Sequence, residues 1–89
     1  MANVYDITLK KEVLFEVGAD VYAQLRNYER KHGYPENTTD NPVFAIKKEV
    51  VQAQYNILSL QTLEELDRIR GQFDSARSCL QELERTRNG

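Results

Sequence analysis

The chain has 89 residues, of which 40% are hydrophobic and 29% are charged, and its formal net charge is −2. A chain of this length forms one domain with a small core, so self-association would add stability. The weak negative charge gives no basic face for nucleic acid or for an acidic membrane. No apolar run is long enough for a membrane span or a secretory signal. We therefore expect a cytoplasmic, helix-rich protein.

The first periodic segment predicts a helix from about residue 9 to residue 32. Apolar residues recur along it at spacings of three and four, at Leu9, Val13, Val17, Val21, Leu25 and Tyr28. Phe15 and Tyr22 widen this stripe on one side. Gly33 follows cationic and polar residues, which is typical of a helix end. Gly18 lies inside the segment, and we interpret it as a local imperfection rather than a point of close helix approach.

Residues 33–41 are rich in turn residues and form the predicted loop. Asn41 can cap the next helix, and Pro42 suits its first position because a missing N–H is harmless there. From residue 42 to about residue 60 the apolar residues follow the heptad spacing of a coiled coil, at Val43, Ile46, Val50, Ala53, Ile57 and Leu60. A second row lies beside this seam, at Phe44, Val51 and Leu58. This helix therefore presents an apolar face wide enough to touch two neighbours.

A third helix is predicted from about residue 63 to residue 87, where the apolar pattern shifts. Continuing the heptad past Leu60 would place only polar residues and glycine on the seam. The new seam lies two residues out of register, at Leu66, Ile69, Phe73, Ala76, Leu80 and Leu83. Thr62 and Glu65 form a capping-box pattern, in which the hydroxyl and the carboxylate satisfy free amides at a helix start. Gly71 falls on the polar side of the new seam, so the pattern indicates no break there.

Two architectures follow from this shift of the seam. The first is a single all-α domain, an antiparallel three-helix bundle whose chain reverses around residues 60–62. The second is a helical hairpin with one long, bent second helix, which would bury its two seams against different partners in an oligomer. The bundle explains the wide face of the second helix. The long helix avoids a reversal that lacks glycine.

The sequence offers little catalytic chemistry. One His and one Cys leave nucleophilic triads and zinc sites out of reach within a single chain. Cys79 cannot form an internal disulfide, and we expect it to be a half-buried helix residue. Glu29 and His32 match half of the motif of di-metal helical bundles, but we interpret them as a solvated helix end, because adjacent cations repel a metal. We therefore predict a protein without enzymatic activity, cofactor or metal.

The predicted function is protein–protein interaction. The chain is expected to be a small interaction or structural protein that binds itself, another protein, or both, as accessory proteins of phages and mobile elements do. Apolar and aromatic residues at the edge of the predicted core form the candidate interaction surface. These residues are Tyr22, Phe44, Val51, Tyr55 and Leu58.

The alternative function is that of a DNA-binding regulator. Tyr5, Ile7 and Leu9 alternate with polar residues as a short strand would, and a helix, a turn and another helix follow. In this order of elements the chain resembles a ribbon-helix-helix repressor. The resemblance implies paired N-terminal strands in the DNA major groove, although the negative net charge opposes DNA binding.

Overall fold

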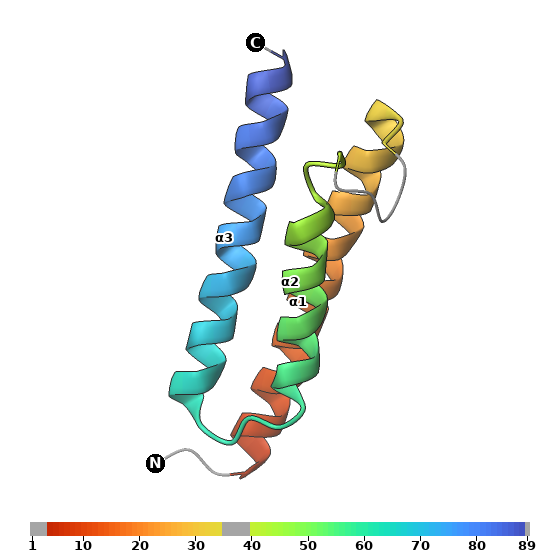
Figure 1. The fold of residues 1–89 in the computed structure, drawn as a ribbon. Helices are drawn as coiled ribbons and strands as arrows, with labels where there is room; N and C mark the ends of the chain where they lie inside the picture. Colours follow the sequence, from red (N-terminus) through yellow and green to blue (C-terminus); the bar gives the residue numbers. More distant parts are fainter. Residues whose placement is uncertain (1–3, 35–39, 89) are drawn as a thin grey trace.

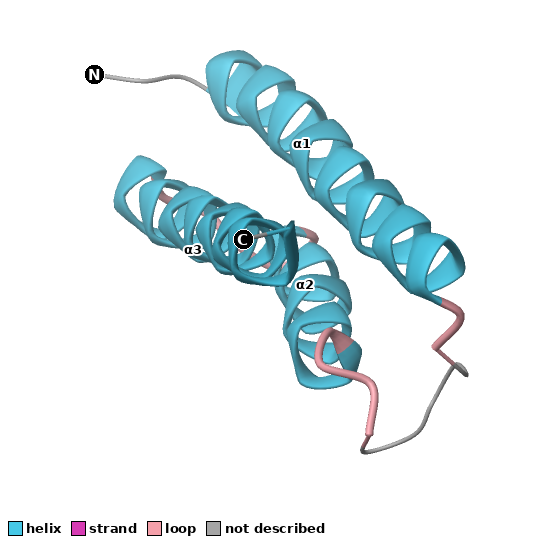
Figure 2. Ribbon diagram, turned by 90° about the horizontal axis from the view of Figure 1, so that it is seen from above, coloured by secondary structure: helices cyan, strands magenta, loops and turns pink. Residues whose placement is uncertain are grey.

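The computed structural model describes the backbone of residues 4–34 and 40–88 and the side chains of residues 6–34 and 40–86. Its helices are α1 (Val4–His32), α2 (Phe44–Ile57) and α3 (Leu63–Asn88). The chain runs up α1, down α2 and up α3 (Figure 1), and all three helix pairs are in contact. Seen from above, the three helices lie around one shared interior (Figure 2). This is the predicted all-α antiparallel three-helix bundle.

The chain reverses between α2 and α3, so the alternative with one long second helix is wrong. At the end of α2 the N–H groups of Leu58, Ser59 and Leu60 donate to carbonyls three residues earlier, over 3.2, 3.1 and 3.3 Å. The predicted capping box then starts α3. The Glu65 N–H donates to the Thr62 hydroxyl oxygen over 3.2 Å, and that hydroxyl donates to the Glu65 carboxylate over 2.8 Å. These tight turns and caps satisfy the backbone locally, so the reversal needs no glycine.

The start of α2 differs from the prediction. The helix begins at Phe44 rather than at residue 42, because Asn41 closes a turn before it. The Asn41 side-chain oxygen accepts a hydrogen bond from the Val43 N–H over 3.0 Å, and its backbone carbonyl accepts one from the Phe44 N–H over 3.1 Å. Asn41 thus organises the turn before α2, but the N-cap of the helix is Val43, two residues after the predicted cap. Of the predicted loop, residues 35–39 lie outside the described residues.

The start of α1 also differs, and this difference removes the predicted strand on which the ribbon-helix-helix resemblance rests. α1 begins at Val4 rather than near residue 9, so Ile7 and Leu9 lie in a helix. A ribbon-helix-helix protein needs an extended strand in this segment. The resemblance to that class is therefore wrong.

The two predicted seams of α2 and α3 form most of the core. The buried hydrophobic residues of these two seams are Val43, Val50, Ala53, Ile57, Leu66, Ile69, Phe73, Ala76 and Leu80. Ile46, Leu60 and Leu83 are partly buried at its edges. Gly71 lies in open space on the polar side of α3, as predicted. The apolar seam changes register near Thr62 because α2 and α3 are separate helices. Each of them turns its own seam toward the shared core.

Only part of the predicted α1 stripe is buried. Val21, Leu25 and Tyr28 lie in the core, whereas Leu9 is 43% exposed and Val13 is 62% exposed. The physical reason is that residues four apart advance by about 400° on a helix of about 3.6 residues per turn, so the row drifts by about 40° at each step. Over the three steps between Val21 and Leu9 the row turns away from the core. Leu14 takes the buried position instead.

Gly18 is the point where all three helices approach one another, so its interpretation as a local imperfection is wrong. A Cβ atom at Gly18 would lie 2.6 Å from Cζ of Phe73 in α3 and 2.8 Å from Cγ of Gln54 in α2. The Phe73 side chain is completely buried. Glycine is required because the Phe73 ring occupies the space that any side chain would fill.

Gly18 and Gly71 form a matched pair of helical glycines that predicts opposite changes in stability. We expect Gly18→Ala to lower the free energy of unfolding by about 1–3 kcal/mol, because the methyl group overpacks the core. A Cβ atom at Gly71 would have no neighbour within 4 Å. Gly71→Ala should therefore raise the free energy of unfolding by about 0.5–1 kcal/mol through helix propensity. Urea denaturation measures both values. A stabilised Gly18→Ala variant would contradict the close contact.

The capping box predicts a pH-dependent contribution to stability. The hydrogen bond from the Thr62 hydroxyl lowers the pKa of the Glu65 carboxyl below its ordinary value of 4.5. A lowered folded-state pKa stabilises the fold above the unfolded-state pKa, and this stabilisation is lost as the pH falls through the folded-state pKa. Thr62→Ala should therefore lower the free energy of unfolding more at neutral pH than in acid, whereas Thr62→Ser keeps the hydroxyl. An equal loss in urea denaturation at both pH values would contradict this linkage.

Candidate partner-binding surface

The structure brings most of the predicted surface residues to one hollow between α1 and α2. Tyr22 of α1 lines it together with Phe44, Val51 and Tyr55 of α2. Leu58 stands just past the end of α2, seven residues after Val51, and continues that row. Tyr55 is 68% exposed and Leu58 is 69% exposed, while Tyr22 and Phe44 are half-buried.

Phe15 extends this surface, although it is not among the residues predicted for it. It is an exposed α1 residue seven positions before Tyr22, so the two share a side of the helix. The Gln54 side-chain amide donates to the Phe15 carbonyl over 3.2 Å, which places Phe15 beside the second half of α2. The spacing from Tyr22 was the sequence signal for this position. We call Phe15, Tyr22, Phe44, Val51, Tyr55 and Leu58 the α1–α2 face.

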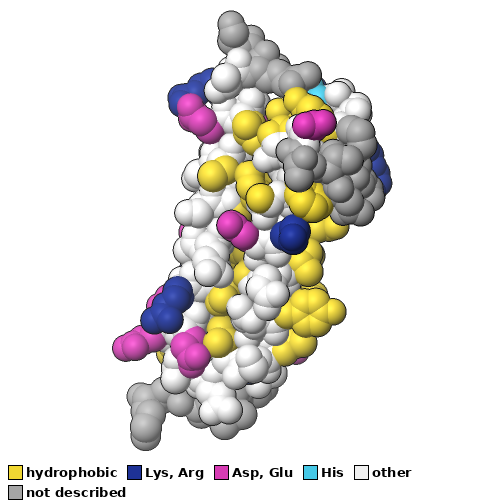
Figure 3. Space-filling model, in the orientation of Figure 1, with side chains coloured by type: hydrophobic (Ala, Val, Ile, Leu, Met, Phe, Trp, Pro, Cys, Tyr) yellow, Lys and Arg dark blue, Asp and Glu magenta, His cyan; other side chains and the backbone are white. Residues whose placement is uncertain are grey.

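Hydrophobic side chains gather on this side of the molecule. In Figure 3 they line the right-hand margin, over α2 and the edge of α1 behind it. Phe15, Val51, Tyr55 and Leu58 all belong to the large hydrophobic residues that remain exposed. Single exposed apolar residues are ordinary, but a group of this kind is a candidate for a protein-binding surface.

A buried ion pair lies behind the hollow and ties α1 to α2. The Lys47 Nζ lies 2.9 Å from both carboxylate oxygens of Glu29, and the two residues are only 5% and 2% exposed. The Asn41 side-chain amide also donates to the Glu29 carboxylate, and the Arg26 Nε lies 3.7 Å from Oε1 of Glu29. These partners satisfy a carboxylate that would otherwise be costly to bury. The expectation that Glu29 is solvated is therefore wrong.

The other residues considered for chemistry are separated in the structure. Glu29 faces Lys47, whereas the His32 ring packs against Tyr28 with ring centroids 4.5 Å apart. Cys79 is exposed rather than half-buried. Within the described residues, the structure brings together no group of three or more His, Cys, Asp or Glu side chains that could hold a metal ion.

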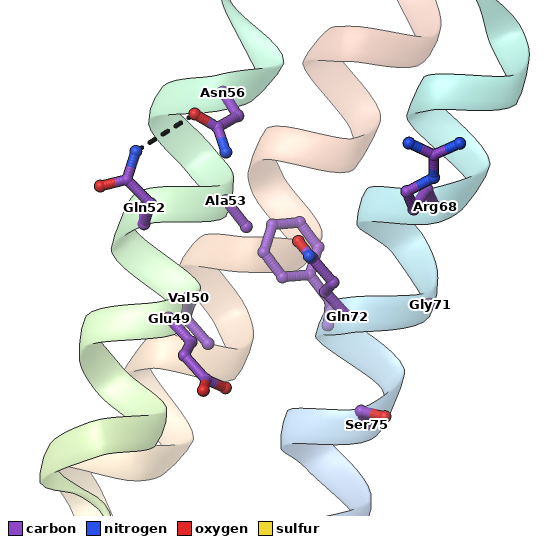
Figure 4. A pocket seen from close by; sticks show the side chains of 10 residues that line it. Glu49, Val50, Gln52, Ala53, Asn56, Arg68, Gly71, Gln72 and Ser75 are labelled. Atoms are coloured by element: carbon purple, nitrogen blue, oxygen red, sulfur yellow. Dashed lines mark hydrogen bonds between the residues drawn. The ribbon is translucent and has the colours of Figure 1, made fainter.

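A second hollow, about 560 Å³ in volume, lies between α2 and α3 and has polar rims. Val50, Ala53 and Phe73 line it together with Glu49 and Arg68. Figure 4 shows Gln52 turned along α2 toward Asn56, to which it donates a hydrogen bond over 3.2 Å. The charged groups that line this hollow are one carboxylate and one guanidinium.

A third hollow lies between α1 and α3 and contains the part of the α1 stripe that drifts out of the core. Leu9 and Val13 line it beside Arg70 and Arg77 of α3. The Arg77 guanidinium pairs with the Asp20 carboxylate over 3.6 Å, which links α3 to α1 at the edge of this hollow. Leu9 and Val13 thus form an exposed apolar pair separate from the α1–α2 face.

These features describe a small three-helix bundle with exposed apolar surface. In the described part of the chain, no helix is long and apolar enough to cross a membrane. A family model described as bacterial epsilon antitoxin matches residues 3–83. The chain therefore belongs to the bacterial epsilon antitoxin family. Comparison with curated proteins and with solved structures gives no match.

The adjacent lysines Lys47 and Lys48 give a test of the buried ion pair. Lys47→Met leaves Glu29 buried without its ammonium partner and should lower the free energy of unfolding by about 3 kcal/mol. Lys48 is exposed, so Lys48→Met should change the free energy of unfolding by less than about 0.5 kcal/mol. Adding Glu29→Leu to Lys47→Met should restore most of the loss, because no unpaired charge remains. Equal stability of the two single variants in urea would contradict this account.

Proposed function

We propose that this chain neutralises a bacterial toxin by binding it through the α1–α2 face, without catalysing a reaction and without a cofactor. Membership of the epsilon antitoxin family supports a toxin as the protein partner. The exposure of Tyr55 and Leu58 carries the choice of surface. Two large exposed side chains three residues apart favour burial against another protein, and tyrosine is frequent at the centres of such interfaces.

Self-association is the second part of the proposal. Leu9 and Val13 expose apolar surface on the α1–α3 side, away from the α1–α2 face. A second copy that covered this pair would enlarge the small core of a short chain. The chain could then bind itself on one side and a toxin on the other. A cytoplasmic location and an origin on a phage or other mobile element, both expected from the sequence, belong to the same proposal.

A growth-rescue assay tests the binding function. Products of neighbouring genes are expressed one at a time in a bacterial host, and the toxin is the product that arrests growth alone but not together with this chain. We expect the double variant Tyr55→Ser, Leu58→Ser to lose the rescue. The matched control, Leu9→Ser with Val13→Ser, removes two exposed apolar side chains from the other side and should retain it. Circular dichroism checks that both variants are folded.

The same proteins separate the two parts of the proposal. In sedimentation equilibrium the Leu9 and Val13 variant should shift toward monomer, whereas the Tyr55 and Leu58 variant should not. A wild-type chain that stays monomeric at high concentration would exclude self-association. Rescue that survives the loss of Tyr55 and Leu58 would exclude the α1–α2 face. If this chain rescues growth from none of the toxic products, the antitoxin function itself is contradicted.

A further inference from the structure

The hollow in the α1–α2 face combines apolar walls with an unbalanced positive charge. Its walls include the side chains of Tyr22, Phe44, Val51 and Tyr55, and its lining also contains Lys47, Lys48 and Gln52. The lining contains no carboxylate, although the whole chain carries a net charge of −2. The hollow is therefore a locally cationic spot on an acidic protein.

The two lysines of the hollow have different roles. The Lys47 ammonium turns inward and is neutralised by both oxygens of Glu29 at 2.9 Å. The Lys48 side chain is exposed, and its Nζ lies over the Phe44 ring at 5.3 Å from the centroid. The ion pairs found among the described residues do not include Lys48. Lys48 thus supplies the single uncompensated charge at the rim.

We propose that this hollow receives a segment of the toxin that presents an apolar side chain next to a carboxylate. The apolar side chain would pack against Val51 and the aromatic walls, and the carboxylate would pair with the Lys48 ammonium. This inference rests on the proposed function and names the chemistry of the partner at the same surface. Nucleic acid fits the hollow less well, because one ammonium cannot neutralise a run of phosphates.

The position of Lys48 suits this role physically. Its ammonium is held over the Phe44 ring by a cation–π contact, so part of its conformational freedom is already lost before a partner arrives. Association would remove water from the apolar walls and strengthen the attraction between the ammonium and a carboxylate. Complementary charge at this rim would also exclude partners that present a cation here.

The test measures toxin binding by calorimetry, with the purified toxin that the growth assay identifies as the probe. We expect Lys48→Glu to weaken binding by about tenfold or more, and Lys48→Met by about fivefold. Lys48→Arg keeps the charge and should bind within about twofold of wild type. Affinity should fall with salt for wild type and less steeply for Lys48→Met. The matched control is Arg70→Glu, which makes the same charge change in the α1–α3 hollow and should bind like wild type.

Other outcomes would overturn the proposal. Binding of Lys48→Glu within about twofold of wild type, or tighter, would show that no carboxylate pairs with this ammonium. An equal loss for Arg70→Glu would assign the effect to the overall field of the protein. The Tyr55 and Leu58 double variant distinguishes failure of the proposed surface from failure of the proposed partner chemistry. If that variant loses binding while Lys48→Glu does not, the surface stands and the proposed partner chemistry fails. If neither loses binding, the surface itself is wrong.

Discussion

The contact between the Phe73 ring and the α1 backbone at Gly18 sets how the three helices sit against one another. Phe73 is completely buried, and the space that a side chain at position 18 would need is filled by this ring and by Gln54 of α2. Because interiors are close-packed, such a contact fixes the approach of α3 to the other two helices. α3 covers the side of α1 and α2 that carries their buried seams. The opposite side of α1 and α2 is not covered by α3 and carries the exposed residues Phe15, Val51, Tyr55 and Leu58.

Much of the fold could be predicted from sequence because local rules set it. The seams of α2 and α3 alternate steps of three and four residues, which keeps a stripe on one side of a helix, and the Thr62 capping box is a four-residue pattern. The α1 stripe was mistaken because steps of four drift around the helix. Gly18 and Glu29 were mistaken for a different reason. Their partners, Phe73 and Lys47, lie far along the chain, and Glu29 is 18 residues from Lys47.

The candidate surface was partly accessible to the same reasoning. The row of Phe44, Val51 and Leu58 follows from heptad spacing beside a buried seam, and the structure places Tyr22 and Tyr55 next to it. Phe15 and Lys48 were missed because their roles depend on how α1 and α2 sit side by side. The family was not predicted, since a binding surface carries no motif of chemically required residues. In such a protein the partner defines the site, and the residues alone define only its shape, polarity and charge.

The central claim is that the α1–α2 face is where the toxin binds. Methyl-labelled antitoxin in complex with unlabelled toxin tests it most directly, through cross-saturation from the toxin to the methyl groups measured by NMR. The account predicts strong saturation transfer to Val51 and Leu58, weak transfer to Leu9 and Val13, and none to the buried methyl groups of Val21 and Leu25. Strong transfer to Leu9 and Val13 with none to Val51 and Leu58 would contradict it.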